Sequence, residues 1–248
     1  MSVSRFQYPA QTTAYKVKVK HGDDWKLHDT CCLDISVGKN YHEGVKLEAT
    51  IGWAQHRFKH VAVAVNDTLQ RFNAMFTGGM TEAEAAELAR QKGDEWILRN
   101  KEILDQLPSY EIFRWNDWTG RADFPEKFAR AQFLYRHNDE FRQNIDSQID
   151  NIWTRRYGSK AEMQHKKAEF RLMSYMYLME ETAVFAMMAE TRNDIHIYPG
   201  SFMKIWGNLE DENLPGLSGR KFARIDFSRN KSVHIPAQPQ GQALPLAL

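Results

Sequence analysis

The first side chain with evident chemistry is Ser36, which ends a short apolar run that begins at Cys31. Gly38 follows as a turn signal, and a helical pattern of apolar residues starts near His42. A strand that stops at a serine, turns on a glycine and enters a helix leaves the hydroxyl at the carboxyl edge of a sheet, where open α/β sheets carry their chemistry. Ser36 is therefore a candidate nucleophile, although a serine in this place can also simply cap the turn or the helix.

Two common loop motifs compete for this segment. A Walker A loop needs a glycine five residues before its Gly-Lys pair and a Ser or Thr after it, whereas this chain has Leu33 and Asn40 there. The nucleophile elbow of α/β-hydrolases needs Gly-x-Ser-x-Gly, and here Asp34 replaces the first glycine. The first motif is excluded, and a serine esterase or acyltransferase of hydrolase type stays as an alternative.

A second chemical pair is formed by Tyr177 and Glu181, which are four residues apart in a stretch that is apolar almost all round from 172 to 188. At this spacing both side chains share one face of a helix. A phenol and a carboxylate in an apolar setting suit acid–base chemistry, because burial moves a carboxyl pKa towards neutrality. The alternative is that Tyr177 packs in the core and Glu181 pairs with an arginine.

The elements that must position these groups alternate along the chain. Short alternating or apolar runs predict strands at 15–20, 31–36, 60–65, 110–115, 196–199 and an edge strand at 222–227. Helical spacing predicts helices from about 42 to 58, from 69 onwards, and over 81–104, 125–137, 139–157, 160–189 and 201–206. Thr81 and Glu84 form a capping pattern, and Gly93 is a point where that helix can break. Strand–helix–strand order predicts an α/β protein with a parallel sheet flanked by helices.

The bulk composition sets limits on domain number and partners. The 248 residues suit one domain over 1–235 with a flexible tail over 236–248. A formal net charge of +1 excludes a global field that attracts DNA or membranes, so a basic site must be a local patch. The only cysteines, Cys31 and Cys32, are adjacent in an apolar run and fit buried thiols in a reducing cytosol. Without a membrane-spanning stretch or a signal peptide, we expect a cytoplasmic protein.

Several of these segments, taken together and in order, resemble the cyclodipeptide synthase family. They are Ser36 in Ile-Ser-Val-Gly followed by Tyr-His-Glu-Gly, then Tyr177-Leu178 with Glu181, then Tyr198-Pro199. The Tyr-Pro pair, with Lys39 three residues past the serine, resembles the XYP branch of that family. The similarity extends over nearly the whole chain, about 14–227.

This resemblance implies a Rossmann-like domain similar to the catalytic domains of class I tyrosyl- and tryptophanyl-tRNA synthetases. Such enzymes join two aminoacyl groups, delivered as tRNA esters, into a 2,5-diketopiperazine, with no cofactor and no metal. Ser36 would hold the first residue covalently. The amine of a second aminoacyl-tRNA would attack that ester to give a dipeptidyl-enzyme, and ring closure would release the product. Glu181 would bind the first ammonium and move its proton, Tyr177 would position the amine, and Tyr198 would orient Ser36.

The resemblance also assigns substrate-binding positions. These are Cys32, Asp34, Gly38, Lys39, His196 and Pro199. The family pattern usually has histidine and glycine where this chain has Thr30 and Asp34. A buried carboxylate at the second position predicts a basic first amino acid, such as histidine, arginine or lysine. The alternative is that Asp34 pairs with a neighbouring lysine or arginine.

Contacts to tRNA are expected from the helix over 81–104. Its candidate residues are Arg90, Lys92, Arg99 and Lys101. Phosphate contacts of this kind give affinity that falls with salt and read little sequence. Mixed charge on a helix is also typical of a solvated face. We expect a monomer that binds two aminoacyl-tRNAs and neither DNA nor membranes. A non-catalytic aminoacyl-tRNA-binding module stays as a further alternative.

Overall fold

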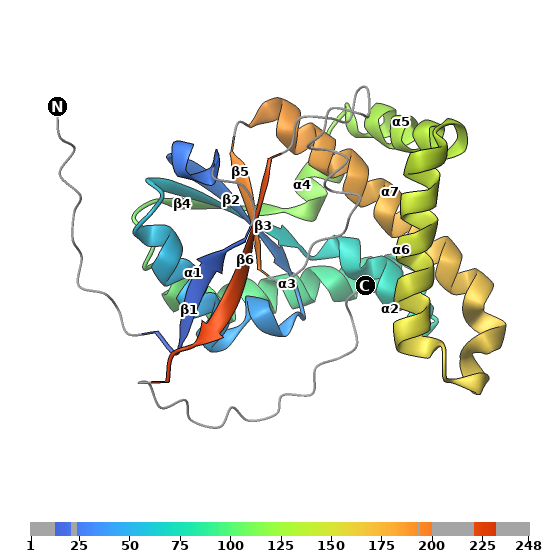
Figure 1. Cartoon of the computed structure of the whole chain (residues 1–248). Coiled ribbons are helices and arrows are strands. Elements are labelled where there is room, and N and C mark those ends of the chain that lie inside the picture. Colours follow the sequence, from blue (N-terminus) through green and yellow to red (C-terminus); the bar gives the residue numbers. More distant parts are fainter. Residues whose placement is uncertain (1–12, 21–23, 193, 200–220, 232–248) are drawn as a thin grey trace.

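The computed structural model describes residues 13–20, 24–192, 194–199 and 221–231. The predicted helix at 201–206 and the predicted tail at 236–248 lie outside these ranges. Within them the chain folds as one α/β unit around a single sheet (Figure 1). The α/β prediction is therefore confirmed. Among the described residues, no helix combines the length and the apolar character needed to cross a bilayer.

The sheet has six strands in the order β1-β6-β5-β2-β3-β4. Their bounds are β1 Tyr15–Val19, β2 Thr30–Ser36, β3 His60–Asn66, β4 Tyr110–Arg114, β5 Ile195–Pro199 and β6 Phe222–Arg229. The strands from β6 to β4 run parallel, whereas β1 pairs antiparallel with β6. The prediction of an edge strand at 222–227 was wrong, because β1 takes the edge position beside it.

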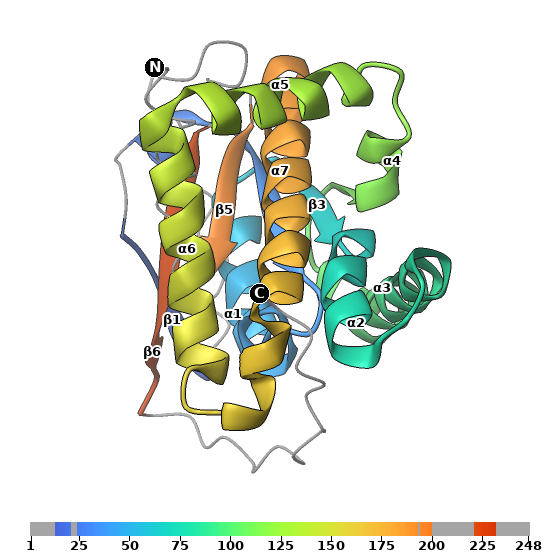
Figure 2. The same cartoon turned by 90° about the vertical axis from the view of Figure 1, so that its right-hand side faces the viewer.

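Helices cover both faces of this sheet. On one face lie α1 Gly44–Gln55 and α3 Glu82–Leu104. On the other lie α2 Arg71–Gly78, α4 Trp115–Thr119, α5 Phe124–His137, α6 Asp139–Tyr157 and α7 Lys167–Thr191. Figure 2 shows α5, α6 and α7 grouped together in front of the strands. This layered arrangement is that of a doubly wound α/β fold.

The alternation of side chains along the central strands decides which residues reach each face. Val61, Val63 and Val65 of β3 pack with α1 and α3, whereas Ala62 and Ala64 pack with α7. Successive strand residues point to opposite faces, so β2 follows the same rule. Cys32, Asp34 and Ser36 therefore share the face that α7 covers.

Two predicted helices differ from those observed. The pattern over 160–189 suggested one helix, but a 3-10 helix occupies Ala161–Lys166 and α7 begins only at Lys167. The chain reverses between α6 and α7, and 3-10 geometry makes the tighter turn that this reversal needs. The helix predicted from about 42 to 58 ends at Gln55, and Phe58 packs in the core beyond its end.

Candidate active site

The candidate nucleophile lies where β2 ends at the carboxyl edge of the sheet. Gly38 has a φ of +89°, and the main-chain N–H of Lys39 donates to the carbonyl of Ser36 at 3.2 Å. Only glycine adopts such a φ at low cost, so the tight turn depends on Gly38. The side chain of Ser36 is buried, with an exposed fraction of 6%. The turn expected after Ser36 is confirmed.

His42 holds this turn through the backbone of Ser36. Its Nδ1 accepts a hydrogen bond from the Ser36 main-chain N–H at 2.5 Å, and its carbonyl accepts from Trp96 Nε1 of α3 at 2.9 Å. Burial lowers the pKa of His42 from 6.5 to about 3, so the ring is neutral. His42 lies in the Tyr-His-Glu-Gly segment, but its role could not be predicted from the sequence, because it depends on a contact to the backbone of Ser36.

The serine hydroxyl is held by an aromatic side chain from β5. Tyr198 Oη lies 3.2 Å from Ser36 Oγ and 3.3 Å from Tyr41 Oη. Strand β5 runs beside β2 in register, which brings Tyr198 to the end of β2. Burial is the main cause that raises the pKa of Tyr198 well above 10, so the phenol stays protonated. Ser36 and Tyr198, which the resemblance paired, are in hydrogen-bonding distance, and Pro199 ends the strand directly after them.

Tyr177 and Glu181 lie on the buried face of α7 that is turned towards this sheet edge, and both are at most 5% exposed. Burial, followed by the charge of Glu181, raises the pKa of Tyr177 well above 10. The pKa of Lys39 falls to about 8, chiefly because of burial and the nearby Arg156 and Arg155, while Glu181 acts in the opposite direction. The site therefore combines a neutral phenol, a carboxylate and an amine that titrates near neutral pH.

Glu180, the residue before Glu181, forms hydrogen bonds and an ion pair that hold helices together. Its two carboxylate oxygens accept from Arg71 at 2.7 and 2.5 Å, and Trp115 Nε1 donates to it at 2.8 Å. These contacts join α7 to α2 and α4. Buried carboxylates are costly unless paired, and Glu180 is fully paired in this way. Glu181 is the buried carboxylate of α7 that shares a helix face with Tyr177 and acts on its pKa.

A cluster of buried polar side chains precedes Ser36 on the same face of the sheet. Asp34 is fully buried, with its Oδ1 3.3 Å from His196 Nδ1 and 3.8 Å from Cys32 Sγ. One partner of Asp34 is therefore a histidine from β5. Among the described residues these three form the one group whose donor atoms, all within 4.8 Å of one another, have metal-ligating geometry. Small side chains on β3, Ala62 and Ala64, border this face.

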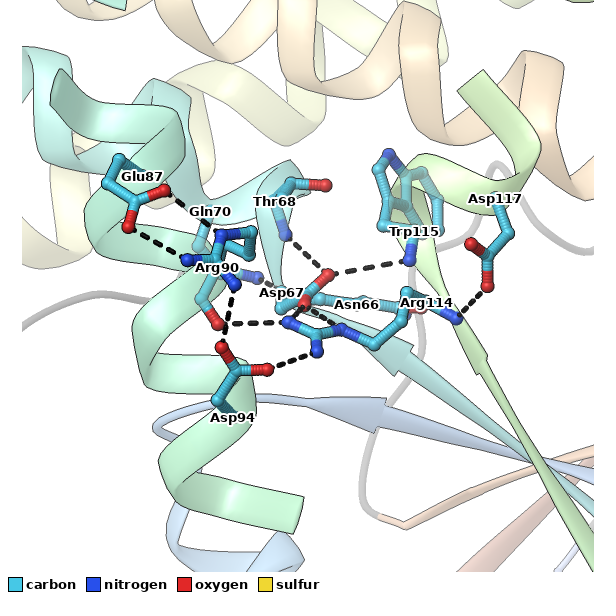
Figure 3. Close-up of polar contacts among 10 residues, drawn as sticks. All are labelled: Asn66, Asp67, Thr68, Gln70, Glu87, Arg90, Asp94, Arg114, Trp115 and Asp117. Carbon is cyan, nitrogen blue, oxygen red and sulfur yellow. Dashed lines mark hydrogen bonds and ion pairs between the residues drawn. The ribbon is translucent and has the colours of Figure 1, made fainter. Parts of the chain in front are cut away.

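A second buried aspartate, Asp67, caps the 3-10 helix Thr68–Gln70 that leads into α2. Figure 3 shows Asp67 accepting hydrogen bonds from the backbone of Thr68 and Trp115 and from the guanidinium of Arg114. Arg114 also pairs with Asp94 of α3. The network ties the ends of β3 and β4 to α3, and so fixes the segment that carries Gln70 towards Tyr177.

The predicted interruption at Gly93 was wrong, because α3 is continuous from Glu82 to Leu104. A Cβ at residue 93 would lie 2.4 Å from Asp67 Oδ2 and 2.7 Å from Arg114 Nη2. The glycine therefore lets the helix approach the Asp67–Arg114 pair closely. The capping box predicted at Thr81 and Glu84 is confirmed.

The four basic residues proposed for tRNA all lie on α3 and all have acidic partners. Arg90 pairs with Glu87 and Asp94, both at 2.9 Å, and Lys92 pairs with Glu95 at 3.2 Å. The remaining two pairs are Arg99–Glu43 at 2.8 Å and Lys101–Asp105 at 2.6 Å. Exposed pairs of this kind are weak, so these cations stay available for phosphate at a small cost.

Comparison with solved structures identifies relatives of this fold. A cyclodipeptide synthase from Fluoribacter dumoffii has a TM-score of 0.77 and 28% sequence identity, covering 87% of this chain and 99% of that one. A cyclodipeptide synthase from Candidatus Glomeribacter gigasporarum, bound to Phe-tRNA, has a TM-score of 0.64 and 19% identity over 86% and 92% of the two chains.

A Mycobacterium tuberculosis protein, whose structure relates cyclodipeptide synthetases to type I tRNA synthetases, has a TM-score of 0.60 and 12% identity over 89% and 96%. No model of a protein family and no curated protein matches the sequence. The resemblance drawn from the motifs is therefore confirmed at the level of the fold: the chain has the fold of cyclodipeptide synthases, and its sequence is similar to that of the Fluoribacter protein over 87% of this chain.

Proposed function

We propose that this protein is a tRNA-dependent cyclodipeptide synthase that carries its intermediates on Ser36. The observation that carries the proposal is the convergence of Ser36, Tyr198, Tyr177 and Glu181 from β2, β5 and α7 at one buried sheet edge. The same four residues are the ones to which the resemblance to the cyclodipeptide synthase family assigns catalytic roles. The activity takes two aminoacyl-tRNAs and is an aminoacyl transfer, which the cyclodipeptide synthase neighbours support.

In the first step Ser36 Oγ attacks the ester carbon of an aminoacyl-tRNA. The new bond is an ester to Ser36, the bond to the terminal ribose oxygen breaks, and the serine proton goes to that oxygen. Tyr198, protonated and 3.2 Å from Oγ, keeps the hydroxyl in place and can relay the proton. Covalent catalysis of this kind divides one transfer into easier steps.

The second step needs the opposite direction of attack from the one expected from the sequence. If the amine of the second aminoacyl-tRNA attacked the Ser36 ester, the dipeptide would end on tRNA. A dipeptidyl-enzyme forms when the amine of the residue on Ser36 attacks the ester of the second aminoacyl-tRNA. That amine must first lose a proton, and Glu181 is the carboxylate placed to take it. Attack by the new terminal amine on the Ser36 ester then closes the ring and frees Ser36.

The first amino acid in this proposal is basic. Asp34 and His196 form a buried polar pair on the pocket side of β2 and β5, where a purely apolar side chain would gain nothing from them. A cationic or imidazole side chain adds a donor to this pair and offsets the cost of burying it. Asp34→Gly is expected to lose basic residues from the products, and an unchanged product spectrum would refute this assignment.

The esterase alternative requires a histidine that removes the proton from Ser36 Oγ. The histidine beside the serine is His42, and its Nδ1 accepts from the main-chain N–H instead. A pKa of about 3 also makes it a poor base near neutral pH. The contacts of Ser36 therefore favour transfer from an activated ester over a triad mechanism.

The test uses a bacterial host that expresses the protein beside a Ser36→Ala control, with mass spectrometry of the medium. New diketopiperazine masses that vanish in the control would support the proposal and identify the amino acids. Salt-dependent tRNA binding without any ring product from the folded protein would favour the binding module. Because aminoacyl-tRNAs are made in the cytoplasm, the proposed enzyme works there. It is proposed to act as a monomer.

A further inference from the structure

The side chain of Gln70 reaches the candidate active site at Tyr177. It is 4% exposed and lies between Asn73 and Tyr177. Its Oε1 accepts from Asn73 Nδ2 at 2.8 Å, and its Nε2 lies 3.3 Å from Tyr177 Oη and 3.5 Å from the carbonyl of Asn66. Because a carbonyl can only accept, the carbonyl of Asn66 requires the NH₂ end on this side. The orientation of the amide is therefore determined by its contacts.

This orientation makes the phenol oxygen of Tyr177 an acceptor from Gln70. A phenol has a single proton, and it cannot be donated to an amide NH₂ group. The proton must then point to an acceptor elsewhere. The charge of Glu181, four residues later on the same face of α7, is close enough to act on the phenol.

We propose that Gln70 is a positioning residue that turns the Tyr177 hydroxyl proton towards Glu181 and the amine bound there. The inference rests on the proposed function for its catalytic meaning. By donating to the phenol oxygen, Gln70 fixes the rotation of the hydroxyl group and leaves its proton for an acceptor on the Glu181 side of Tyr177. Preorganised dipoles of this kind lower the cost of reaching the transition state.

Gln70 is rigidly placed for this purpose. It ends the short 3-10 helix Thr68–Gln70, which follows the Asp67 network directly (Figure 3). The next residue, Arg71, is held by both oxygens of Glu180 on α7. The segment is thus fixed to β4 on one side and to the helix that carries Tyr177 on the other.

The test compares Gln70→Met, which keeps the length and lacks the donor, with Gln70→Glu, which offers an acceptor. Thr77→Val, on the exposed side of α2, is the matched control, because its hydroxyl bonds only within that helix. A fluorinated tyrosine at residue 177, whose phenol titrates at lower pH, is followed by ¹⁹F NMR. Thermal unfolding establishes that each variant is folded.

The expected result is a higher pKa of residue 177 in Gln70→Met, because the lost donor favoured the phenolate, and a still higher one in Gln70→Glu. In turnover assays kcat should fall about tenfold in both variants, with KM for aminoacyl-tRNA unchanged. Thr77→Val should match the wild type. If the pKa of residue 177 is unchanged in both Gln70 variants, the inference is overturned. An unchanged kcat would overturn it as well. Absence of turnover in the wild type would instead count against the proposed function. The NMR titration would still show whether Gln70 donates a hydrogen bond to the phenol of residue 177.

Discussion

At the scale of single residues, Ser36 is held at two points by groups with different tasks. His42 accepts from its main-chain N–H, and Tyr198 contacts its hydroxyl. The backbone contact keeps the turn in shape, whereas the hydroxyl contact acts on the reacting atom. The protonation state of His42 therefore affects both the stability of the fold and the shape of the turn at Ser36.

Replacing His42 should test that separation. Asn carries an acceptor oxygen near the place of Nδ1, so His42→Asn should keep more of the folding stability and activity than His42→Leu, which leaves the Ser36 N–H without a partner at a cost of about 1–3 kcal/mol. Chemical denaturation and single-turnover acylation measure the two effects. Equal losses in both variants would show that the acceptor on residue 42 is unimportant.

The same residue predicts a pH dependence of stability. In the unfolded chain His42 titrates near 6.5, and in the folded protein at about 3. Between these values the unfolded state binds a proton that the folded state does not, so stability falls as pH drops through this window. His42→Asn removes this contribution, and its free energy of unfolding should decline less between pH 7 and pH 4. Parallel declines in the two proteins would contradict the burial of a neutral imidazole.

The adjacent carboxylates Glu180 and Glu181 should separate stability from activity. Glu180→Gln weakens a buried pair with Arg71, and breaking such a pair costs about 3–5 kcal/mol, so a clear loss of thermal stability is expected. Glu181→Gln should leave the unfolding temperature nearly unchanged and abolish product. The two variants are matched controls for each other, and a reversed pattern would exchange the roles assigned to them.

At the scale of elements, the sequence predicted most strands and helices because their periodicity is local. Strand β2 and the turn after it followed from an apolar run, a serine and a glycine. The sequence could not reveal that β1 returns to pair with β6, since that pairing joins distant segments. Gly93 was misread for the same reason: its neighbours Asp67 and Arg114 come from other elements.

Gly93→Ala tests the close approach of α3 to the Asp67 network. In an isolated helix this change stabilises by about 0.5–1 kcal/mol, because glycine is the poorer helix former. Here the added Cβ would meet Asp67 Oδ2 at 2.4 Å, so we expect destabilisation of about 1–3 kcal/mol instead. Denaturant unfolding measures the sign, with Gln91→Ala on the exposed side of the same helix as the control. A gain in stability for Gly93→Ala would show that the network yields easily.

At the scale of the whole molecule, the candidate catalytic residues lie at one edge of the sheet, whereas α3, which carries the four cations proposed for tRNA, covers the face opposite α7. The sequence motifs located Ser36, Tyr177, Glu181 and Tyr198, because their types and order were distinctive. His42 was part of the quoted Tyr-His-Glu-Gly segment but received no role, and Gln70 was not selected, since a lone glutamine carries no pattern. Their roles come from contacts that only the folded chain provides.

The role of α3 in tRNA binding is a prediction that salt dependence can test. Replacing Arg90, Lys92, Arg99 and Lys101 together with glutamine should weaken tRNA binding at low salt and reduce the slope of log K against log salt by up to about three units, if each contacts one phosphate. Filter binding over a range of salt concentrations gives the slope. The acidic neighbours stay in this variant, so a control with Glu87 and Glu95 changed to glutamine should bind more tightly. An unchanged slope would direct attention to Arg155 and Arg156 at the end of α6.

The central claim, a covalent intermediate on Ser36, is tested most directly by intact-protein mass spectrometry after brief mixing with one aminoacyl-tRNA and acid quench. We predict a mass increase equal to one aminoacyl residue in the wild type, located by peptide mapping to the segment that contains Ser36 and absent from Ser36→Ala. Diketopiperazine formation without any adduct on Ser36, or an adduct that persists in Ser36→Ala, would contradict the account.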